Sequence, residues 1–559
     1  MSCRVFSLVV GFCLVAAPCA AWPGGDESPD LIFRGGPILT VDASDRVVEA
    51  IAVRDGVITA AGSEQEILAM QSSGTEIHDL GGRALIPGFV AAHEHPTLTA
   101  IFGGVADVRG FTHPTNAAVW SELRAAVAAS SKGDWIYAMG LDPMLVPDLV
   151  MPTRASLDEL APDNPVVVVA QTMHSFWANS RAFAGAGITR DTPDPGHGAF
   201  YGRDEAGEFT GFISEGAAAA PLLARLRSPW RMFGRYGAAL DELVAAGFTS
   251  VGSLGFSVPP WLARWSSSKR LKPRIRQFVY LAEQDLSYLP DKPDRSDPFF
   301  RIQGVKLWHD GSPYTGSMFI EEPYLDSPLA RRLGIVPGSR GEEMIAHDRL
   351  VAQIRQYGDA GWQVAIHSQG DASNRAVAAA LAEVPDHPEL APRRIEHCVM
   401  IPREALATLA SLRVSPSFHI NHLWYYGETL NDSILGPERT AAILPIKAAF
   451  ELGLRPTLHA DSPMFPPEPF SLMRTAMLRR TRTGRVIGAD QAIDARQALR
   501  AMTINGAYQL GAEDLIGSIE VGKQADLVVL SASPYDVAPE SIDTIRSTEV
   551  YLAGRRVDP

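Results

Sequence analysis

Short apolar segments alternate with helix-like segments through the middle of the chain, and this alternation is the feature that most restricts the fold. The candidate strands are residues 249–253, 274–281, 304–308, 363–367, 394–397, 413–418 and 455–459. Helix-like stretches such as 374–383 and 403–411 lie between them. Alternating strands and helices form parallel βα units, and about eight units close into a barrel with its chemistry at the carboxyl ends of the strands. The pattern therefore predicts an α/β protein with a (β/α)8 TIM-type barrel.

Both ends of the chain are β-rich instead. DLIFRGGPILTVD and EAIAVRDGVITAAG near the N-terminus, and GKQADLVVLSAS and STEVYLAGRRV near the C-terminus, read as short strands broken by Gly and Asp turns. We expect one small β-sandwich built from both termini. Residues from about 100 to 225 break the barrel rhythm and hold strand candidates of their own, so they predict an inserted lid subdomain. The loop 309–341 is a second expected cover.

The length of 559 residues exceeds what one compact core organises, so several units are expected. The predicted units are a signal peptide at 1–21, the N-terminal part of the β-sandwich at 22–87, the barrel at 88–485 with its insertion at about 100–225, and the last barrel helix with the C-terminal part of the β-sandwich at 486–559.

The first 21 residues have the pattern of a targeting segment. Arg4 is their only charge, an apolar run follows, and small residues precede Trp22. This pattern predicts a secretory signal cleaved near Ala21 and a periplasmic or secreted protein. A lipoprotein modified at Cys19 is the competing reading. No later run is long and apolar enough to predict a membrane span.

Net charge and cysteine count restrict the partners and the cross-links that the chain can have. The net charge of −14 argues against a nucleic-acid-binding surface. Cys398 is the single cysteine after residue 21, so no intramolecular disulfide is expected in the mature chain.

Ionisable side chains repeatedly end the apolar strand candidates. They are His93 and His95 after ALIPGFVAA, Lys306 in GVKLWHDGS, His367 in WQVAIH, His397 in RRIEH, and His459 and Asp461 in LRPTLHAD. A buried strand has no packing reason to end this way, and carboxyl ends of parallel strands meet at one edge. Imidazoles and a carboxylate can hold one or two divalent metals. For Lys306 the residue alone favours a salt bridge or a substrate contact. The alternative is that, in a dry pocket, it loses its proton and forms a carbamate with carbon dioxide.

Longer motifs extend this pattern across the chain. They are ALIPGFVAAHEHP, PTRASLDELAPDNPVVV, HSFWANSRAF, GEFTGFISEGA, GVKLWHDGSPYTGS, AIHSQGDASNRAV, RRIEHC, PSFHINHLWYYG, LHADSPMFPPEP and LIGSIEVGKQADLVVL. Together they span residues from about 30 to 555. The sequence resembles the amidohydrolase superfamily, and in its finer motifs amidohydrolase family 3, the YtcJ-like group that includes N-substituted formamide deformylases.

The resemblance implies roles for individual residues. His93 and His95 would bind a buried metal, His367 and His397 a more exposed one, and N6-carboxylated Lys306 would bridge the two. Asp461 would be metal ligand and general base, and His422 would polarise the scissile carbonyl or orient the substrate. The expected cofactor is two zinc ions, with manganese, iron or cobalt as alternatives, and the choice between one metal and two stays open.

The implied activity is hydrolysis of a non-peptide C–N bond, of amide, N-acyl or N-formyl type, by attack of a metal-bound hydroxide. The expected partner is a small-molecule amide-type substrate, and the assembly expected for such folds is a homodimer. Residues expected to contact substrate are His174, Trp177, His309, Trp424 and Tyr425. Two positions depart from the family: Glu94 replaces a common Thr, and His309 replaces a small residue. Glu94 is expected to point away from the metal.

Two other functions remain open at this point. A metal-dependent deaminase of a heterocycle uses similar chemistry, but a single-metal deaminase has no use for a carbamate, so metal stoichiometry and mass spectrometry of Lys306 would separate the two. A secreted non-catalytic binding or regulatory protein would be marked by a missing ligand, and none is missing from the sequence.

Deleting residues 2–21 is predicted to keep the protein inside the cell, because the charge, apolar run and small-residue site would all be gone. Cell fractionation measures this. Export of the shortened protein at the level of the full chain would contradict the signal-peptide prediction.

Overall fold

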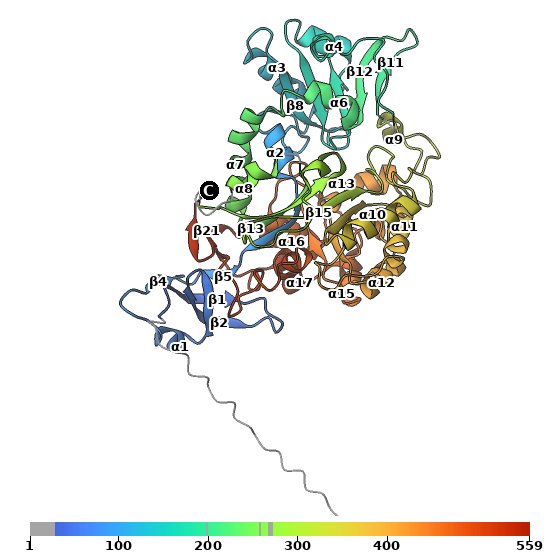
Figure 1. The fold of residues 1–559 in the computed structure, drawn as a ribbon. Helices are drawn as coiled ribbons and strands as arrows, with labels where there is room; N and C mark the ends of the chain where they lie inside the picture. The colour runs from blue at the N-terminus through green and yellow to red at the C-terminus, as the bar shows by residue number, and fades with distance from the viewer. Residues whose placement is uncertain (1–27, 197–198, 257–258, 267–271, 559) are drawn as a thin grey trace, which may run out of the picture.

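The computed structural model describes residues 28–196, 199–256, 259–266 and 272–558, so the predicted signal peptide lies outside the described residues. Three sheets organise the molecule: one of the barrel, one of the insertion and one built from both ends of the chain (Figure 1). In this part of the chain, no helix has both the length and the apolar character needed to cross a membrane.

Eight parallel strands form a nearly closed barrel, as predicted from the alternation of strands and helices. In sheet order the strands are β19 (Thr457–Leu458), β18 (Ser415–Phe418), β17 (Arg394–His397), β16 (Gln363–Ser368), β15 (Phe300–Trp308), β14 (Arg276–Ala282), β13 (Phe248–Phe256) and β6 (Phe89–Glu94). Most of their residues are buried, which explains apolar runs in place of strict alternation.

Helices connect and cover these strands. They are α2 (Pro96–Phe102), α7 (Pro229–Ala246), α8 (Pro260–Ser266), α9 (Pro328–Arg332), α10 (His347–Asp359), α11 (Asp371–Ala382), α12 (Arg403–Ser411), α13 (Asn421–Thr429), α14 (Pro437–Ala441), α15 (Ile446–Glu451), α16 (Pro469–Leu478), α17 (Ala495–Met502) and α18 (Ile504–Gln509). The predicted helix 403–411 coincides with α12, and 374–383 overlaps α11.

The insertion forms a six-stranded sheet with its own apolar core, at the opposite end of the molecule from the terminal sheet (Figure 1). Its elements are β7 (Ala106–Asp107), α3 (Asn116–Ala128), β8 (Ile136–Leu141), α4 (Arg154–Leu160), β9 (Val166–Ala170), β10 (Ser175–Ala178), α5 (Ser180–Gly185), β11 (Phe200–Arg203), β12 (Phe209–Ser214) and α6 (Glu215–Leu223). The loop after β15 touches it: Nη1 of Arg332 donates to the Pro147 carbonyl at 2.8 Å. Insertion and loop therefore lie against each other over the barrel.

Both ends of the chain enter one continuous sheet. Its strands are β1 (Leu31–Leu39), β2 (Val47–Arg54), β3 (Val57–Gly62), β4 (Glu76–Asp79), β5 (Ala84–Pro87), β20 (Leu527–Leu530), β21 (Ser547–Leu552) and β22 (Arg555–Val557), and α1 (Glu64–Leu68) packs on them. β1 changes partner at its two glycines, from β4 before them to β5 after them. Gly35 has a φ of +77°, and a Cβ on Gly36 would lie 2.1 Å from the Arg83 carbonyl oxygen.

A buried ion pair joins the barrel to this terminal sheet. Arg276, at the start of β14, and Asp526, just before β20, are both almost fully buried. Nε and Nη2 of Arg276 lie 2.6 Å and 2.9 Å from the two carboxylate oxygens, and Nη1 donates to the Pro298 carbonyl at 2.7 Å.

Replacing Arg276 by Met is predicted to destabilise the protein by about 3–5 kcal/mol, because it leaves a buried Asp526 carboxylate without its cation. The loss should appear as a lower midpoint in chemical or thermal unfolding. Arg349→Met is the matched control, since Arg349 forms an exposed pair with Glu283 and should shift the midpoint little. Equal midpoints for the two variants would contradict the role of Arg276.

Candidate metal centre

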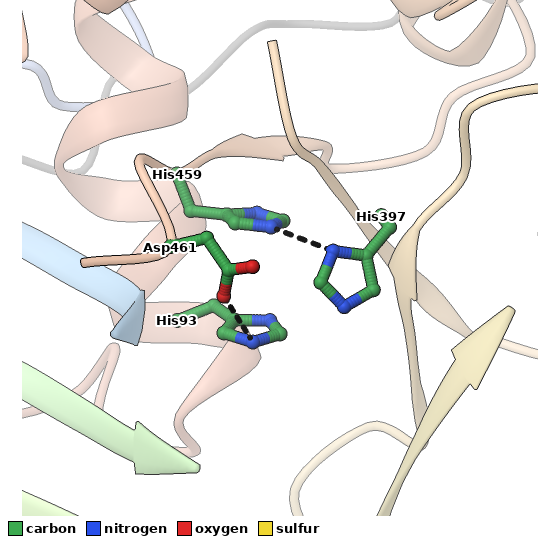
Figure 2. Close-up of side chains that lie close together, drawn as sticks. All are labelled: His93, His397, His459 and Asp461. Carbon is green, nitrogen blue, oxygen red and sulfur yellow. Dashed lines mark hydrogen bonds and ion pairs between the residues drawn. The ribbon is translucent and has the colours of Figure 1, made fainter. Parts of the chain in front are cut away.

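Four side chains from separate parts of the barrel converge at the carboxyl end of its strands. They are His93, His397, His459 and Asp461, and each offers a ligand atom within 4.8 Å of those of the others (Figure 2). His93 lies on β6, His397 ends β17, and the other two residues follow β19. The strand-end pattern placed three of them in the predicted metal set, whereas His459 had no assigned role.

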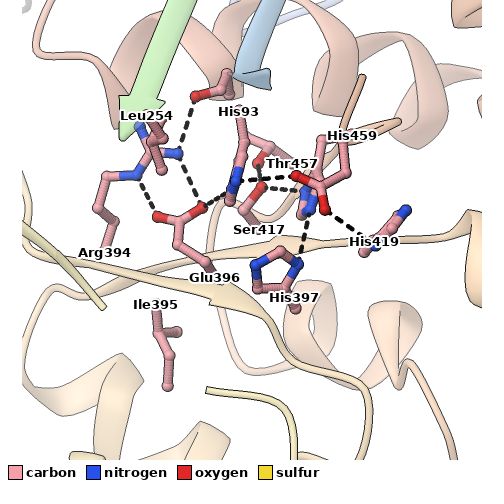
Figure 3. A network of polar contacts seen from close by, with 12 residues as sticks. His93, Leu254, Arg394, Ile395, Glu396, His397, Ser417, His419, Thr457 and His459 are labelled. Atoms are coloured by element: carbon pink, nitrogen blue, oxygen red, sulfur yellow. Dashed lines mark hydrogen bonds and ion pairs between the residues drawn. The ribbon is translucent and has the colours of Figure 1, made fainter. Parts of the chain in front are cut away.

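A chain of buried charges fixes the His93 ring. Its Nδ1–H donates to Oε2 of Glu396 at 2.6 Å, and Nη2 of Arg394 lies 3.0 Å from the same oxygen (Figure 3). Burial opposes a charge on Glu396, but Arg394 and His93 outweigh it and lower the carboxyl pKa well below its usual value. Because Nδ1 holds the proton, Nε2 of a neutral His93 presents a lone pair to the group.

His95 is fixed in the same way by a backbone carbonyl. Its Nδ1–H donates to the Leu254 oxygen at 2.6 Å, so Nε2 is the nitrogen that faces the group. The Nε2 atoms of His95 and His93 then lie 2.9 Å and 3.3 Å from the same Asp461 oxygen, Oδ1. Nitrogen lone pairs that point at a carboxylate oxygen repel it unless a proton or a metal cation lies between them.

The His397 and His459 rings show the same convergence. Nδ1 of His397 and Nε2 of His459 lie 3.3 Å apart, and Nδ1 of His459 lies 2.8 Å from Oγ of Ser417. Burial lowers the pKa of both imidazoles well below its ordinary value, which favours neutral rings. A proton or a metal cation would relieve this crowding, and neutral imidazoles with a carboxylate are ordinary zinc ligands. The side chains therefore fit a divalent cation.

Left-handed backbone conformations aim these side chains. His397 and Asp461 have φ values of 73° and 63°. In a regular strand His397 would share a face with Ile395, on the opposite side from Glu396. The turn at His397 instead brings its ring beside the His93 ring, with a centroid distance of 4.9 Å. Such strain is typical of functional sites.

Glu94 closes the seam between the first and last barrel strands. β6 and β19 are the two ends of the barrel sheet, and no ladder joins them in the part of the chain that the structure describes. Instead, the Glu94 carboxylate accepts hydrogen bonds from the N–H groups of Ala460, at 3.0 Å, and Ser462. Burial raises the Glu94 pKa to about 7, against these hydrogen bonds. Glu94 is outside the metal group, and its carboxylate holds the backbone on both sides of Asp461.

Lys306 is buried beside the group. Its side chain is 1% exposed, and Nζ has no hydrogen-bond partner among the described residues. Burial lowers its pKa to about 8. An unpaired amine of this kind is nucleophilic in its neutral form.

A cavity of about 190 Å³ opens on these residues. Of the predicted site residues, it is lined by His95, His174, Lys306, His367, His397, His422 and Asp461. His367 packs on His397 with ring centroids 4.3 Å apart, and Nδ1 of His422 lies 2.5 Å from the Tyr314 hydroxyl. His174 comes from the insertion, so the lid contributes directly to the cavity.

Four predicted substrate contacts do not line this cavity: His309, Trp177, Trp424 and Tyr425. Nδ1 of His309 lies 2.8 Å from the Ser373 hydroxyl, on α11. Trp177 lines a separate cavity between the insertion and the loop after β15. Trp424 and Tyr425 lie on α13 and line another cavity. Trp424, two residues after His422, falls on the opposite face of the helix, whereas the Tyr425 ring stacks on Phe465 with centroids 4.2 Å apart.

Several residues of the site escaped the sequence reasoning. His419 lines the cavity, and its Nδ1 lies 3.8 Å from Oδ2 of Asp461. Arg394 and Glu396 could have been found from the sequence. Two opposite charges at positions i and i+2 of a buried strand lie on the same face, so they can pair in the interior. Glu94 could not have been found this way, since its partners are backbone N–H groups.

Replacing Glu94 by Ala is predicted to weaken zinc binding about 10- to 100-fold, as loss of an outer support of a metal ligand does. The N–H groups that flank Asp461 would lose their acceptor, and the ligand would no longer be held in place. Competition with a chromogenic chelator measures the affinity. Glu94→Gln keeps one acceptor and should lose less, and Glu404→Ala, on the exposed face of α12, should bind zinc as the wild type does. Wild-type affinity in Glu94→Ala would contradict the role of Glu94.

The sequence is similar to known proteins over most of its length. A model of the amidohydrolase family matches residues 76–558. The N-substituted formamide deformylase of Arthrobacter pascens is 26% identical over 546 residues, which cover 94% of this chain and 97% of the relative. YtcJ of Bacillus subtilis (strain 168) is 25% identical over 552 residues, which cover 94% and 99%.

A crystal structure gives the same fold. It is that of an uncharacterized metal-dependent hydrolase from Pyrococcus horikoshii OT3, with a TM-score of 0.73 and 23% identity over 91% of this chain and 99% of that one. The barrel, the histidine–aspartate group and the match over most of the sequence agree with the motif-based prediction. The protein is therefore a metal-dependent hydrolase of the amidohydrolase superfamily, and the chain belongs to amidohydrolase family 3.

Proposed function

We propose that the protein hydrolyses a non-peptide amide-type C–N bond of a small molecule, with N-acyl and N-formyl amides as the substrate class. The observation that carries the proposal is the convergence of neutral imidazoles on Asp461 at the floor of a cavity. The deformylase activity named for the Arthrobacter pascens relative supports this choice of bond.

The cation would be held by His93, His397, His459 and Asp461, with His95 close to the same carboxylate. When bound, it supplies a Lewis acid that polarises a carbonyl and makes water more acidic. His367 and Lys306, which line the adjoining wall, would hold a second cation if Lys306 carries a carbamate. Two zinc ions are the content we propose, and metal analysis with mass spectrometry of Lys306 tests it.

Asp461 would act as the general base. Its Oδ1 contacts His93 and His95, and the residue lines the cavity, so its carboxylate can accept a proton from the attacking water. The loop that carries it is held by Glu94 and by the bond from the His95 N–H to the Ser462 carbonyl, at 3.1 Å. This support keeps the base at a fixed position relative to the ligands.

His422 would stabilise the carbonyl oxygen. Burial raises the pKa of Tyr314 well above its usual value and lowers that of His422 well below, so a neutral phenol faces a neutral imidazole. The Tyr314 O–H then donates to Nδ1, and Nε2 of His422 carries the ring proton. Nε2 has no partner among the described residues, so this N–H is available to a developing oxyanion.

An apolar cavity beside the metal site would take the rest of the substrate. It measures about 300 Å³, and its apolar lining includes Leu141, Met144 and Trp177. Thr172 lines both cavities, so they share a wall. We infer a substrate that carries an alkyl or aryl group next to its amide, with Trp177 as one of that group's contacts.

Zinc-loaded protein is predicted to release a primary amine from N-alkyl or N-aryl formamides or acetamides, and Asp461→Asn to lower kcat by about 10²–10⁴ because the general base is lost. Amine and carboxylate release are measured together, with and without a chelator. Ammonia release from a heterocycle such as adenine, with no amide cleavage, would favour the deaminase instead.

Asp326→Asn is the matched control, because Asp326 forms an exposed ion pair with Arg331 in the loop after β15. It should keep wild-type turnover. Full amide turnover in metal-free protein, or in Asp461→Asn, would refute the proposed mechanism.

A further inference from the structure

The insertion places an imidazole–carboxylate pair in the wall of the metal cavity. His174 lies between β9 and β10 and lines the cavity together with Lys306, His367 and Asp461. Its Nδ1 lies 2.9 Å from Oε2 of Glu215, the first residue of α6. The ligand group comes from the barrel, so this pair faces it from a different part of the protein.

Main-chain and side-chain contacts together fix the pair. The Glu215 N–H donates to the His174 carbonyl at 2.8 Å, which adds a second tether between the same two residues. Met173 and Glu215 have positive φ values of 60° and 66°. Residues with a side chain rarely adopt this conformation, and it persists where the surroundings enforce it, often at functional sites.

His174 lines the cavity, and both members of its pair with Glu215 are partly exposed. The side chains of His174 and Glu215 are 31% and 28% exposed, in contrast with the fully buried His93. Since Nδ1 is engaged by Glu215, the free edge of the ring is Nε2, which has no hydrogen-bond partner within the described ranges. Burial opposes a charge on His174, but Glu215 outweighs it and raises the imidazole pKa above its ordinary value.

The position of the apolar cavity indicates which part of the substrate would meet His174. Thr172, two residues before His174, lines both the metal cavity and the apolar cavity beside it. A substituent on the amide nitrogen that enters the apolar cavity would bring that nitrogen to the insertion side of the site. The carbonyl would remain on the barrel side, near Asp461 and His422.

We propose that His174 is the acid that protonates the leaving nitrogen and that Glu215 is the positioning residue that orients its ring. This inference rests on the proposed C–N hydrolysis and adds a second proton-transfer group to it. A poor leaving group such as an alkylamine must be protonated as the C–N bond breaks, and a positioned imidazolium is suited to this task.

The proton and electron balance closes over one cycle. The water oxygen bonds to the carbonyl carbon, and its proton passes to Asp461. The C–N bond then breaks, its electron pair stays on nitrogen, and that nitrogen takes the proton from Nε2 of His174. The acid and the amine leave, and the proton on Asp461 returns through solvent to His174.

The test compares two substrates that share one acyl group, an N-alkyl amide and a p-nitrophenyl ester, whose phenolate leaves without a proton. With zinc-loaded protein, His174→Gln is expected to lower kcat on the amide about 100-fold and to change ester turnover less than about threefold. Glu215→Gln should show the same selectivity with a smaller loss. An equal loss on both substrates, or no loss on the amide, would overturn the inference.

A matched control is available on the protein surface. His347 and Glu383 form an exposed pair, with Nε2 and Oε1 2.7 Å apart, and His347→Gln should turn over both substrates as the wild type does. A wild type that cleaves no amide would overturn the proposed function and this inference with it. If the wild type cleaves the amide but His174→Gln lowers amide and ester turnover equally, only the inference is overturned.

A readout without turnover separates positioning from general stability. Histidine NMR of the metal-free protein should show a resonance that is absent in His174→Gln and titrates at lower pH in Glu215→Gln, because the ring loses its neighbouring anion. The other ionisable groups that influence His174, Asp461 and His367, are unchanged in that variant. An unchanged midpoint would contradict the role of Glu215.

Discussion

The site depends on the seam where the barrel closes. β6 brings His93 and β19 leads to Asp461, but no strand ladder joins these two strands in the described part of the chain. The Glu94 carboxylate, bonded to the N–H groups on both sides of Asp461, supplies the connection that a ladder would otherwise give. His93 and Asp461 thus come from opposite sides of a gap that is bridged by the Glu94 carboxylate and by the bond from the His95 N–H to the Ser462 carbonyl. The position of Asp461 relative to His93 therefore depends on how the barrel closes.

A buried ion pair beside His93 determines which of its ring nitrogens carries the proton. The Arg394–Glu396 pair is wholly buried, and Glu396 accepts the Nδ1 proton of His93. A buried ion pair is weak evidence of net stability, because desolvation offsets its attraction. Here it has a second effect, since it fixes which nitrogen of His93 faces the cation. The Leu254 carbonyl does the same for His95 with no charge at all, so the structure reaches one tautomeric state by two physical routes.

Much of this arrangement was predictable from the sequence, and the failures have identifiable causes. Parallel strands end at one edge, so ionisable residues at strand ends pointed to His93, His397 and Asp461 before any coordinates. Contacts made through the backbone leave no pattern in the side chains, so the sequence did not predict that Glu94 holds the backbone on both sides of Asp461. Trp424 and Tyr425 were expected to contact substrate as aromatic residues of a lid. They line a different cavity, because Trp424 falls on the helix face opposite His422 and the Tyr425 ring stacks on Phe465.

The insertion contains a contact that the sequence did not predict, and it adds a second wall to the site. The composition of the insertion predicted a cover, yet nothing in the sequence joins His174 to Glu215, 41 residues apart, across a turn with strained backbone. A barrel alone presents one wall of ligands to its substrate. Amide hydrolysis needs a proton removed on one side of the carbonyl carbon and a proton delivered on the other, which two walls can provide at once. An insertion with its own core can supply the second wall and still vary its apolar cavity, while the ligand set on the barrel stays the same.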